Sequence, residues 1–259
     1  MTTLAFGDVT VALGDGFVAT VEIHRAPNNY FDLALLRSLA DAYVELEGRD
    51  DCRAIVLCSE GKHFCAGVDF AAGFAPDGAA STAVLYVEAA RLFHSQLPVV
   101  AAIQGAAVGG GLGLACSADF RVVAPEARFA ANFARLGFHQ GFGLSVTLPR
   151  IVGPQRAAEL LYTGRRINAD EAMALGLCDR GADAAELRMS AIAFAAELAS
   201  SAPLAVRSIR ATLRADLLSQ LDEALQREAI EQDRLRATAD WREGIRAMAE
   251  RREPRFEGR

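Results

Sequence analysis

Apolar residues recur with two different spacings along the 259-residue chain. Through the first two thirds, runs with a period of two alternate with stretches of period 3.6, and beyond Ala182 the spacing stays helical. This alternation predicts an α/β core followed by a helical tail. Strands are expected at four β-branched-rich runs bounded by Gly, Pro or Asp, at residues 17–23, 53–59, 99–104 and 120–124.

Helix signals fill the spaces between these strands. Asp32 is placed to cap a helix whose apolar positions recur every three or four residues, and Gly48 is placed to end it. The Gly- and Ala-rich segment 71–80 is expected to be a loop, followed by a helix over 81–96. Four further helices are expected in the tail, at residues 185–200, 204–215, 217–236 and 240–251.

Composition narrows the class of protein. With 52% hydrophobic and 23% charged residues, the chain is able to bury a core of its own. The net charge of −6 argues against a nucleic-acid-binding surface spread over the protein. There is no apolar run of about 18 residues and no secretory pattern at the start, so we expect a cytoplasmic protein without a membrane segment. The five cysteines include no C-x-x-C pair, which favours free thiols over a disulfide framework or a metal site.

Two glycine-centred loops, residues 63–70 and 104–115, follow predicted strands and are expected to lead into helices. The first N–H groups of a helix lack partners inside the helix, and adjacent glycines let a ligand approach the backbone closely. A dinucleotide-binding loop is disfavoured because Cys116 stands where the third glycine belongs, and no Walker lysine follows. A nucleophile elbow at Ser145 is disfavoured because Thr147 replaces its closing glycine.

Taken together, these loops resemble those of the crotonase (enoyl-CoA hydratase/isomerase) superfamily. The resemblance rests on residues 64–70 (FCAGVDF) and 103–111 (IQGAAVGGG). Shorter matches follow in the same order and extend it over almost the whole chain, at residues 118–121, 127–129, 148–153, 162–165, 172–177 and 254–256.

The resemblance implies a spiral of ββα units over residues 1–200 and a C-terminal helical oligomerisation region over 201–259, assembled as a homotrimer or a dimer of trimers. It implies an acyl-CoA substrate and no cofactor beyond the coenzyme A of that substrate. It places an oxyanion hole at the backbone N–H groups of Val68 and Gly110, which would stabilise the negative charge of a thioester enolate. The implied coenzyme and substrate contacts are Arg25, Ala26, Lys62, Ala66, Gly67, Asp69, Phe70, Gly109 and Phe133.

The sequence departs from the family where hydratases carry two glutamates, because Gly113 and Phe133 stand at those positions. Neither residue can transfer a proton, so hydration by two carboxylates is in doubt. The segment 136–143 resembles the naphthoate-synthase branch, with His139 in place of an aspartate. Because histidine titrates near neutral pH, His139 is the predicted acid/base, with structural packing as its alternative role. Asn132 is a lesser candidate for orienting water.

Other candidate residues favour structural roles. His94 and Tyr86 share a helical register with apolar neighbours. A structural role is also favoured for His24, His63 and Cys65, since a thiol needs an electropositive partner to be reactive. A cluster of phenylalanines is expected in the core or, if some face the pocket, to favour an apolar or aromatic acyl group: Phe129, Phe133, Phe138 and Phe142. The predicted function is an enolate-forming acyl-CoA enzyme, with a catalytically silent acyl-CoA-binding module or a β-diketone hydrolase as alternatives.

Overall fold

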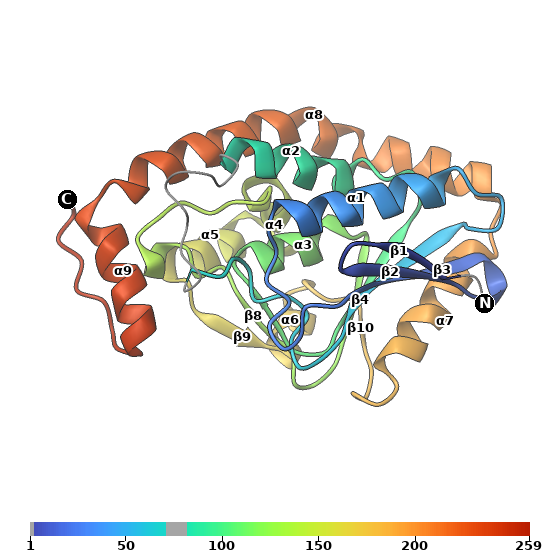
Figure 1. Ribbon diagram of the computed structural model, residues 1–259, viewed down its shortest axis with the longest axis horizontal. Helices are drawn as coiled ribbons and strands as arrows, with labels where there is room; N and C mark the ends of the chain where they lie inside the picture. Colours follow the sequence, from blue (N-terminus) through green and yellow to red (C-terminus); the bar gives the residue numbers. More distant parts are fainter. Residues whose placement is uncertain (1–2, 71–81) are drawn as a thin grey trace.

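Two β-sheets and the helices around them make up the part of the chain that the computed structural model describes, residues 3–70 and 82–259 (Figure 1). The larger sheet is antiparallel over its first three strands and parallel from the third strand onward. Its strands lie in the order β1 (Thr3–Phe6), β2 (Val9–Leu13), β3 (Val18–Ile23), β4 (Ala54–Ser59), β5 (Val99–Ile103), β7 (Phe120–Val123) and β10 (Arg180–Gly181). The smaller sheet consists of β6 (Ala106–Val108), β8 (Arg128–Ala130) and β9 (Arg166–Asn168).

Helices cover both faces of the larger sheet. Helix α7 (Leu187–Ala199) packs on β3, β4, β5 and β7 from one side, and α1 (Leu33–Glu47) packs on the opposite face. Every residue of β4 is buried, as expected for a parallel strand covered on both faces. The predicted α/β core with a helical C-terminal region is confirmed.

The remaining helices pack beside this sheet and beside one another. Helix α8 (Pro203–Arg236) runs along the top of Figure 1, over α2 (Thr82–Phe93) and α4 (Leu144–Val152). The other described α-helices are α3 (Gly110–Ser117), α5 (Pro154–Thr163), α6 (Ala169–Ala174) and α9 (Ala239–Glu250), and two short 3-10 helices are η1 (Asp15–Phe17) and η2 (Ala134–Leu136).

The four predicted strands are each present within one residue of their expected bounds. The predicted cap of α1 is also present, because the Asp32 carboxylate accepts a 2.8 Å hydrogen bond from the Leu35 N–H, and Gly48 follows the last helical residue. The predicted loop at 71–80 lies outside the described residues.

The prediction of separate helices over 204–215 and 217–236 was wrong, since both belong to the 34-residue helix α8. Asp216, between the two predicted segments, is compatible with a helix, and neither Gly nor Pro interrupts the chain there. Pro203 occupies the first turn, where its missing N–H costs no helical hydrogen bond.

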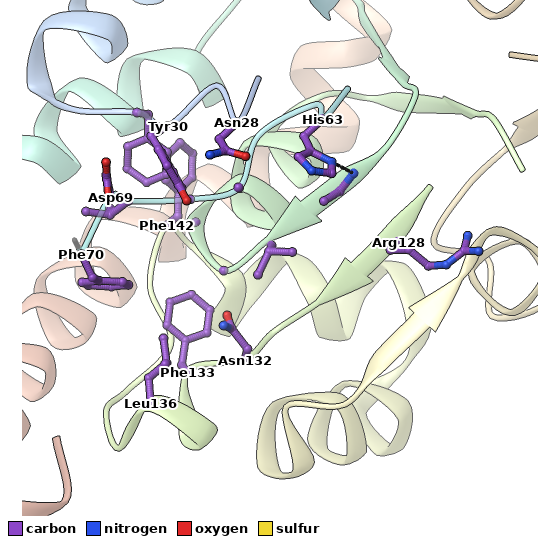
Figure 2. A pocket seen from close by; sticks show the side chains of 18 of the residues that line it. Asn28, Tyr30, His63, Asp69, Phe70, Arg128, Asn132, Phe133, Leu136 and Phe142 are labelled. Atoms are coloured by element: carbon purple, nitrogen blue, oxygen red, sulfur yellow. Dashed lines mark hydrogen bonds between the residues drawn. The ribbon is translucent and has the colours of Figure 1, made fainter. Parts of the chain in front are cut away.

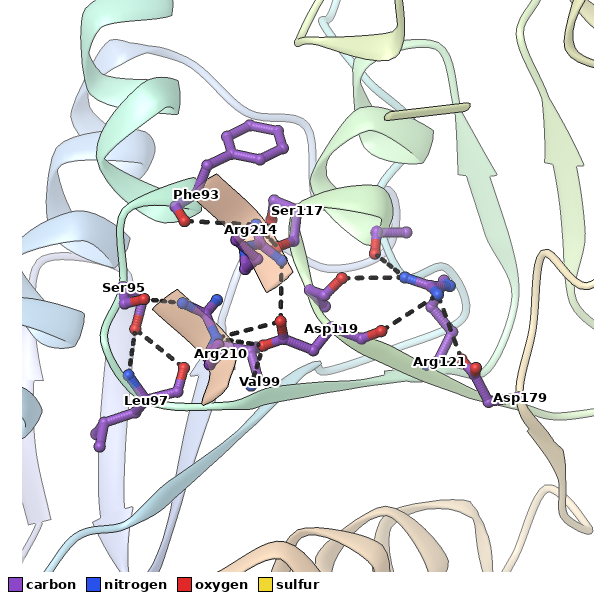
Figure 3. Close-up of polar contacts among 12 residues, drawn as sticks. Phe93, Ser95, Leu97, Val99, Ser117, Asp119, Arg121, Asp179, Arg210 and Arg214 are labelled. Atoms are coloured by element: carbon purple, nitrogen blue, oxygen red, sulfur yellow. Dashed lines mark hydrogen bonds and ion pairs between the residues drawn. The ribbon is translucent and has the colours of Figure 1, made fainter. Parts of the chain in front are cut away.

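A buried ionic cluster fixes the first half of α8 to the sheet (Figure 3). The Asp119 carboxylate lies 2.9 Å from Arg210 Nε and 2.9 Å from Arg214 Nη1, and it also accepts from the Val99 N–H. Arg210 donates further to the Ser95 carbonyl. A short segment at the start of β7 therefore joins α8 to β5.

Within the described ranges, no single helix is long and apolar enough to cross a membrane. Helices α7 and α8 reach that length and apolar composition only when they are counted together, and the chain bends by 101° between them. Helix α8 begins close to the predicted boundary at residue 201. The oligomerisation role of this region stays a prediction.

Candidate active site

A cavity of about 840 Å³ lies where the two glycine loops meet. Both loops contribute to its wall, the first through residues 66–70 and the second through residues 104–106 and 108–110. Aromatic side chains line much of the rest, among them Phe31 and Phe138. Figure 2 shows two more, Phe133 and Phe142. The predicted aromatic cluster thus has members that face this cavity, while Phe129 belongs to the core.

Backbone hydrogen bonds hold the two glycine loops side by side. The Cys65 N–H donates to the Ala106 carbonyl at 3.0 Å, and the Val108 N–H donates to the Cys65 carbonyl at 3.1 Å. Along the chain, the short strand β6 separates β5 from α3. The sequence pattern predicts, in contrast, that the chain passes directly from that strand into the helix. A Cβ atom at Gly111 would lie 2.0 Å from the Cys65 carbonyl oxygen, so this close approach requires glycine.

This contact brings two backbone amides to the cavity. Gly67 has φ +90°, and a Cβ atom there would lie 2.9 Å from the Val108 oxygen and 3.7 Å from the Gly110 nitrogen. Val68 follows Gly67, and Gly110 is the first residue of α3. Neither the Val68 N–H nor the Gly110 N–H donates to another residue in the described ranges. Both residues line the cavity, and amides of this kind can stabilise an oxygen that carries negative charge.

Phe142 occupies the space that a side chain at position 113 would need. A Cβ atom at Gly113 would lie 2.4 Å from Phe142 Cβ, and the Phe142 ring packs edge-on against Phe31 with 5.3 Å between centroids. Phe142 itself has φ +60°, an uncommon value for a residue with a side chain. A glutamate at position 113 is therefore sterically incompatible with this turn.

Three residues with polar side chains line the cavity. Figure 2 shows Tyr30 above, Asp69 to the left, and Asn132 below beside Phe133. Burial, with the nearby charge of Asp69, raises the pKa of Tyr30, so the phenol keeps its proton at neutral pH. A Cβ atom at Gly109 would lie 3.3 Å from Asn132 Oδ1, so the Asn132 side chain lies next to the start of α3. These groups can donate or accept a proton or orient a water molecule.

The structure brings most of the predicted site residues together at the cavity. Its wall includes Lys62, Ala66, Gly67, Val68, Asp69, Phe70, Gly109, Gly110 and Phe133. Arg25 and Ala26 are not among the described lining residues, and the Arg25 guanidinium pairs with Asp8 at 2.7 Å and Asp32 at 2.9 Å. Their coenzyme-binding roles stay predictions.

His139 is also absent from the described lining residues. Its Nδ1 lies 2.8 Å from the carbonyl oxygen of Gln140, and its own carbonyl accepts from the Gln232 side chain at 3.0 Å. The neighbouring rings of Phe138 and Phe142 take the positions that face the cavity. The acid/base role of His139 stays a prediction.

The thiols and the remaining histidine near the loops fit the expected structural roles. All five cysteines are buried and unpaired, and burial raises the pKa of Cys65 to about 12, so it remains a thiol at neutral pH. His63 accepts from the Ala106 N–H at 3.2 Å. Burial, with the charge of Lys62, lowers the pKa of His63.

Comparisons with known proteins identify the family of this chain. The family model for enoyl-CoA hydratase/isomerase matches residues 14–259. The chain belongs to the enoyl-CoA hydratase/isomerase family.

Individual members of the family match over most of their length. A probable enoyl-CoA hydratase of Bacillus subtilis is 33% identical over 94% of this chain and 96% of its own. A crotonyl-CoA hydratase of Syntrophomonas wolfei is 34% identical over 85% of this chain and 86% of its own. The crystal structure of an enoyl-CoA hydratase/isomerase from Pseudoalteromonas atlantica superposes with a TM-score of 0.88 at 27% identity, covering 96% of this chain and all of that one. Acyl-CoA processing is the activity that this family membership supports.

Sequence reasoning missed two cationic side chains at this family site. Arg128 of β8 and Arg166 of β9 line the same cavity as Lys62. The two strands are antiparallel neighbours, with Ala130 opposite Arg166. Pairing between such short strands leaves no periodic signal in the sequence, so nothing there joins these arginines to the glycine loops.

Sequence reasoning also missed a buried carboxylate on α8. Glu228 is fully buried and accepts from the Gly143 N–H at 2.8 Å and the Ser145 N–H at 2.9 Å. Burial raises its pKa to about 7, against the opposing effect of these hydrogen bonds. Through Gly143, Glu228 holds the turn that presents Phe142 to the cavity.

Proposed function

We propose that this chain binds an acyl-CoA thioester with its carbonyl oxygen between the Val68 and Gly110 amides, and promotes reactions that pass through the thioester enolate. The two amides, both at the cavity and without another acceptor among the described residues, are the observation that carries the proposal. Enolate formation moves negative charge onto the carbonyl oxygen, so donors aimed at that oxygen stabilise the transition state more than the bound substrate.

Charge and shape fit the rest of such a substrate. Lys62, Arg128 and Arg166 offer positive charge for the phosphates of coenzyme A. The ring of Phe133 and the ring of Phe142 surround the acyl side with apolar surface. Exclusion of water by this apolar surface would strengthen the hydrogen bonds to the thioester oxygen.

Exchange of the protons next to the thioester carbonyl tests the enolate directly. Phenylacetyl-CoA in deuterium oxide should lose its α-proton NMR signal in the presence of the protein. Val68→Pro removes one N–H donor and should slow the exchange about 100-fold, since one such donor is worth about 3 kcal/mol. Val68→Ala keeps the amide and should stay close to the unaltered protein.

Coenzyme A binding and thermal melting distinguish a lost donor from a lost fold. If Val68→Pro stays folded, binds coenzyme A and exchanges α-protons at the original rate, the oxyanion hole is wrong. Tight binding of acyl-CoA without any exchange by the unaltered protein would instead favour the catalytically silent binding module.

For proton transfer we propose Asp69, with Tyr30 as its neighbour, because both residues line the cavity. A positioned general base contributes about 100-fold or more, so Asp69→Asn should slow α-proton exchange by at least that factor. His139→Ala should leave the rate within about twofold. The reverse result, with a large loss in His139→Ala alone, would establish His139 as the acid/base.

A further inference from the structure

The turn over residues 139–145 holds an aromatic side chain in an uncommon backbone conformation at the cavity. Phe142 has φ +60°, is 1% exposed and is among the residues that line the cavity. A residue with a large side chain rarely adopts a positive φ, and the conformation persists only where the surrounding contacts impose it. The neighbours of this turn must therefore hold it in place.

Helices α2 and α8, which lie side by side at the top of Figure 1, hold the first half of the turn. The Tyr86 hydroxyl donates to Gln232 Oε1 at 3.1 Å, and the Gln232 side-chain amide donates to the His139 carbonyl at 3.0 Å. A Cβ atom at Gly141 would lie 2.5 Å from Gln232 Nε2 and would overlap the Tyr86 hydroxyl. The turn thus packs directly against both side chains.

Glu228 of α8 holds the second half of the turn. Its carboxylate accepts from the Gly143 N–H at 2.8 Å and from the Ser145 N–H at 2.9 Å. Glu228 and Gln232 are four residues apart on α8, so they lie on the same face of the helix. Phe142 lies between these two anchors, and one helix face therefore fixes the chain on both sides of it.

The ring fixed in this way lies beside the proposed oxyanion hole. A Cβ atom at Gly110 would lie 3.6 Å from Phe142 Cδ2. The Phe142 ring packs edge-on against Phe31, with 5.3 Å between centroids, and lies 6.3 Å from the fully buried ring of Phe93. With the thioester oxygen at the Gly110 amide, the ring borders the acyl carbons next to the thioester. A ring packed in this way leaves little room for a bulkier group.

We propose that Phe142 is a specificity-determining residue, which admits acyl-CoA thioesters with an unbranched α-carbon and disfavours those with a branch at that carbon. Tyr86, Gln232 and Glu228 are positioning residues, because they act through the place of the ring. The inference rests on the proposed acyl-CoA function and adds its substrate class. One added carbon in a closely fitting apolar pocket changes binding by about 10-fold or more.

A natural fluorophore allows binding to be measured without knowledge of the reaction. Trp241 is the only tryptophan of the chain, and its ring lies 5.4 Å from Phe70 and 4.6 Å from Phe138, both of which line the cavity. Its emission should change when an acyl group enters. Phenylacetyl-CoA and racemic 2-phenylpropanoyl-CoA make a matched pair, since they differ by one methyl group on the α-carbon.

We expect phenylacetyl-CoA to bind about 10-fold more tightly than 2-phenylpropanoyl-CoA, or better. Phe142→Ala should reduce this preference to less than about threefold, chiefly through tighter binding of the branched thioester. Glu228→Ala removes the acceptor of two N–H groups and should reduce the preference by about half, whereas Glu228→Gln keeps one acceptor oxygen and should retain more of it. Glu223→Gln, an exposed change on the same helix, is the matched control and should keep the full preference.

Each outcome separates the substrate class from the underlying function. Equal binding of the two thioesters, or a full preference in folded Phe142→Ala, would overturn the inference and leave the acyl-CoA function standing. Failure of both thioesters and of coenzyme A to bind would overturn the proposed function itself.

Second variants keep the inference testable if the first ones do not fold. Phe142→Leu keeps an apolar side chain of smaller volume and should still lower the preference about twofold. An unchanged preference in that variant would count against the role of Phe142. A full preference in folded Glu228→Ala, or in Glu228→Gln if the alanine variant does not fold, would overturn the positioning role of Glu228.

Discussion

Helix α8 contributes to two groups of buried or largely buried charged and polar side chains, and the groups lie in different parts of the protein. The Asp119 cluster joins Asp119 to Arg210 and Arg214 in the first half of the helix. The Glu228 cluster comprises Glu228, Gln232 and Arg236 in the second half. Every member of the Asp119 cluster lies outside the described cavity wall, whereas Gln232 and Arg236 form part of it.

The difference shows that a buried charge is not by itself a sign of a functional site. In the Asp119 cluster, the carboxylate lies between two guanidinium groups and accepts a backbone N–H, so its acceptor capacity is used within the protein. In the Glu228 cluster, the partners of the carboxylate among the described residues are two backbone amides and a hydroxyl, while Arg236 lines the cavity. The Glu228 cluster differs from the Asp119 cluster because two of its members, Gln232 and Arg236, line the cavity.

Removal of Asp119 should give the largest effect on stability. Asp119→Ala leaves two buried guanidinium groups without their shared carboxylate, which we expect to lower the free energy of unfolding by about 3–5 kcal/mol. Urea denaturation measures this change. The folded fraction should bind coenzyme A with unchanged affinity, since the cluster lies outside the cavity wall.

Asp216→Ala provides the control for Asp119. Asp216 is also on α8 and pairs with Arg150, but its side chain is 68% exposed, so its loss should cost less than about 1 kcal/mol. Equal losses in the two variants would contradict the view that burial makes the Asp119 cluster important for stability.

Local sequence signals predicted one half of the site and missed the other. The loop around Gly110 contains three consecutive glycines and the loop around Val68 contains Gly67, and each loop follows a recognisable strand, so both loops could be located from local sequence. The resemblance to a family then supplied the predicted role of their backbone amides. The cap at Asp32 was predictable for the same reason. The aromatic residues were predicted for the core or the pocket, and the sequence does not say which rings face the cavity.

The missed half depends on contacts between distant segments. Glu228 meets Gly143 and Ser145 across more than 80 residues, and Arg236 meets Thr82 across 154. In the sequence, both side chains belong to a long helix rich in alternating acids and arginines, as on a solvated face. The three-residue strands that bring Arg128 and Arg166 to the cavity are too short to show a period of two.

Glu228 should give a smaller effect that depends on pH. Its pKa is about 7 in the folded protein against 4.5 for the ordinary group, so the folded state binds more protons between these values. Stability should therefore fall as pH rises from 4.5 to 7, by about 3 kcal/mol from this group, and the contribution should stay constant above pH 7. Glu228→Gln cannot titrate, so the difference in unfolding free energy between the two proteins should follow this slope. Glu223→Gln, an exposed change on the same helix, should keep the pH dependence of the unaltered protein. A Glu228→Gln variant with the original pH dependence would show that this carboxylate does not carry the raised pKa, and the contrast between the two halves of α8 would then rest on position alone.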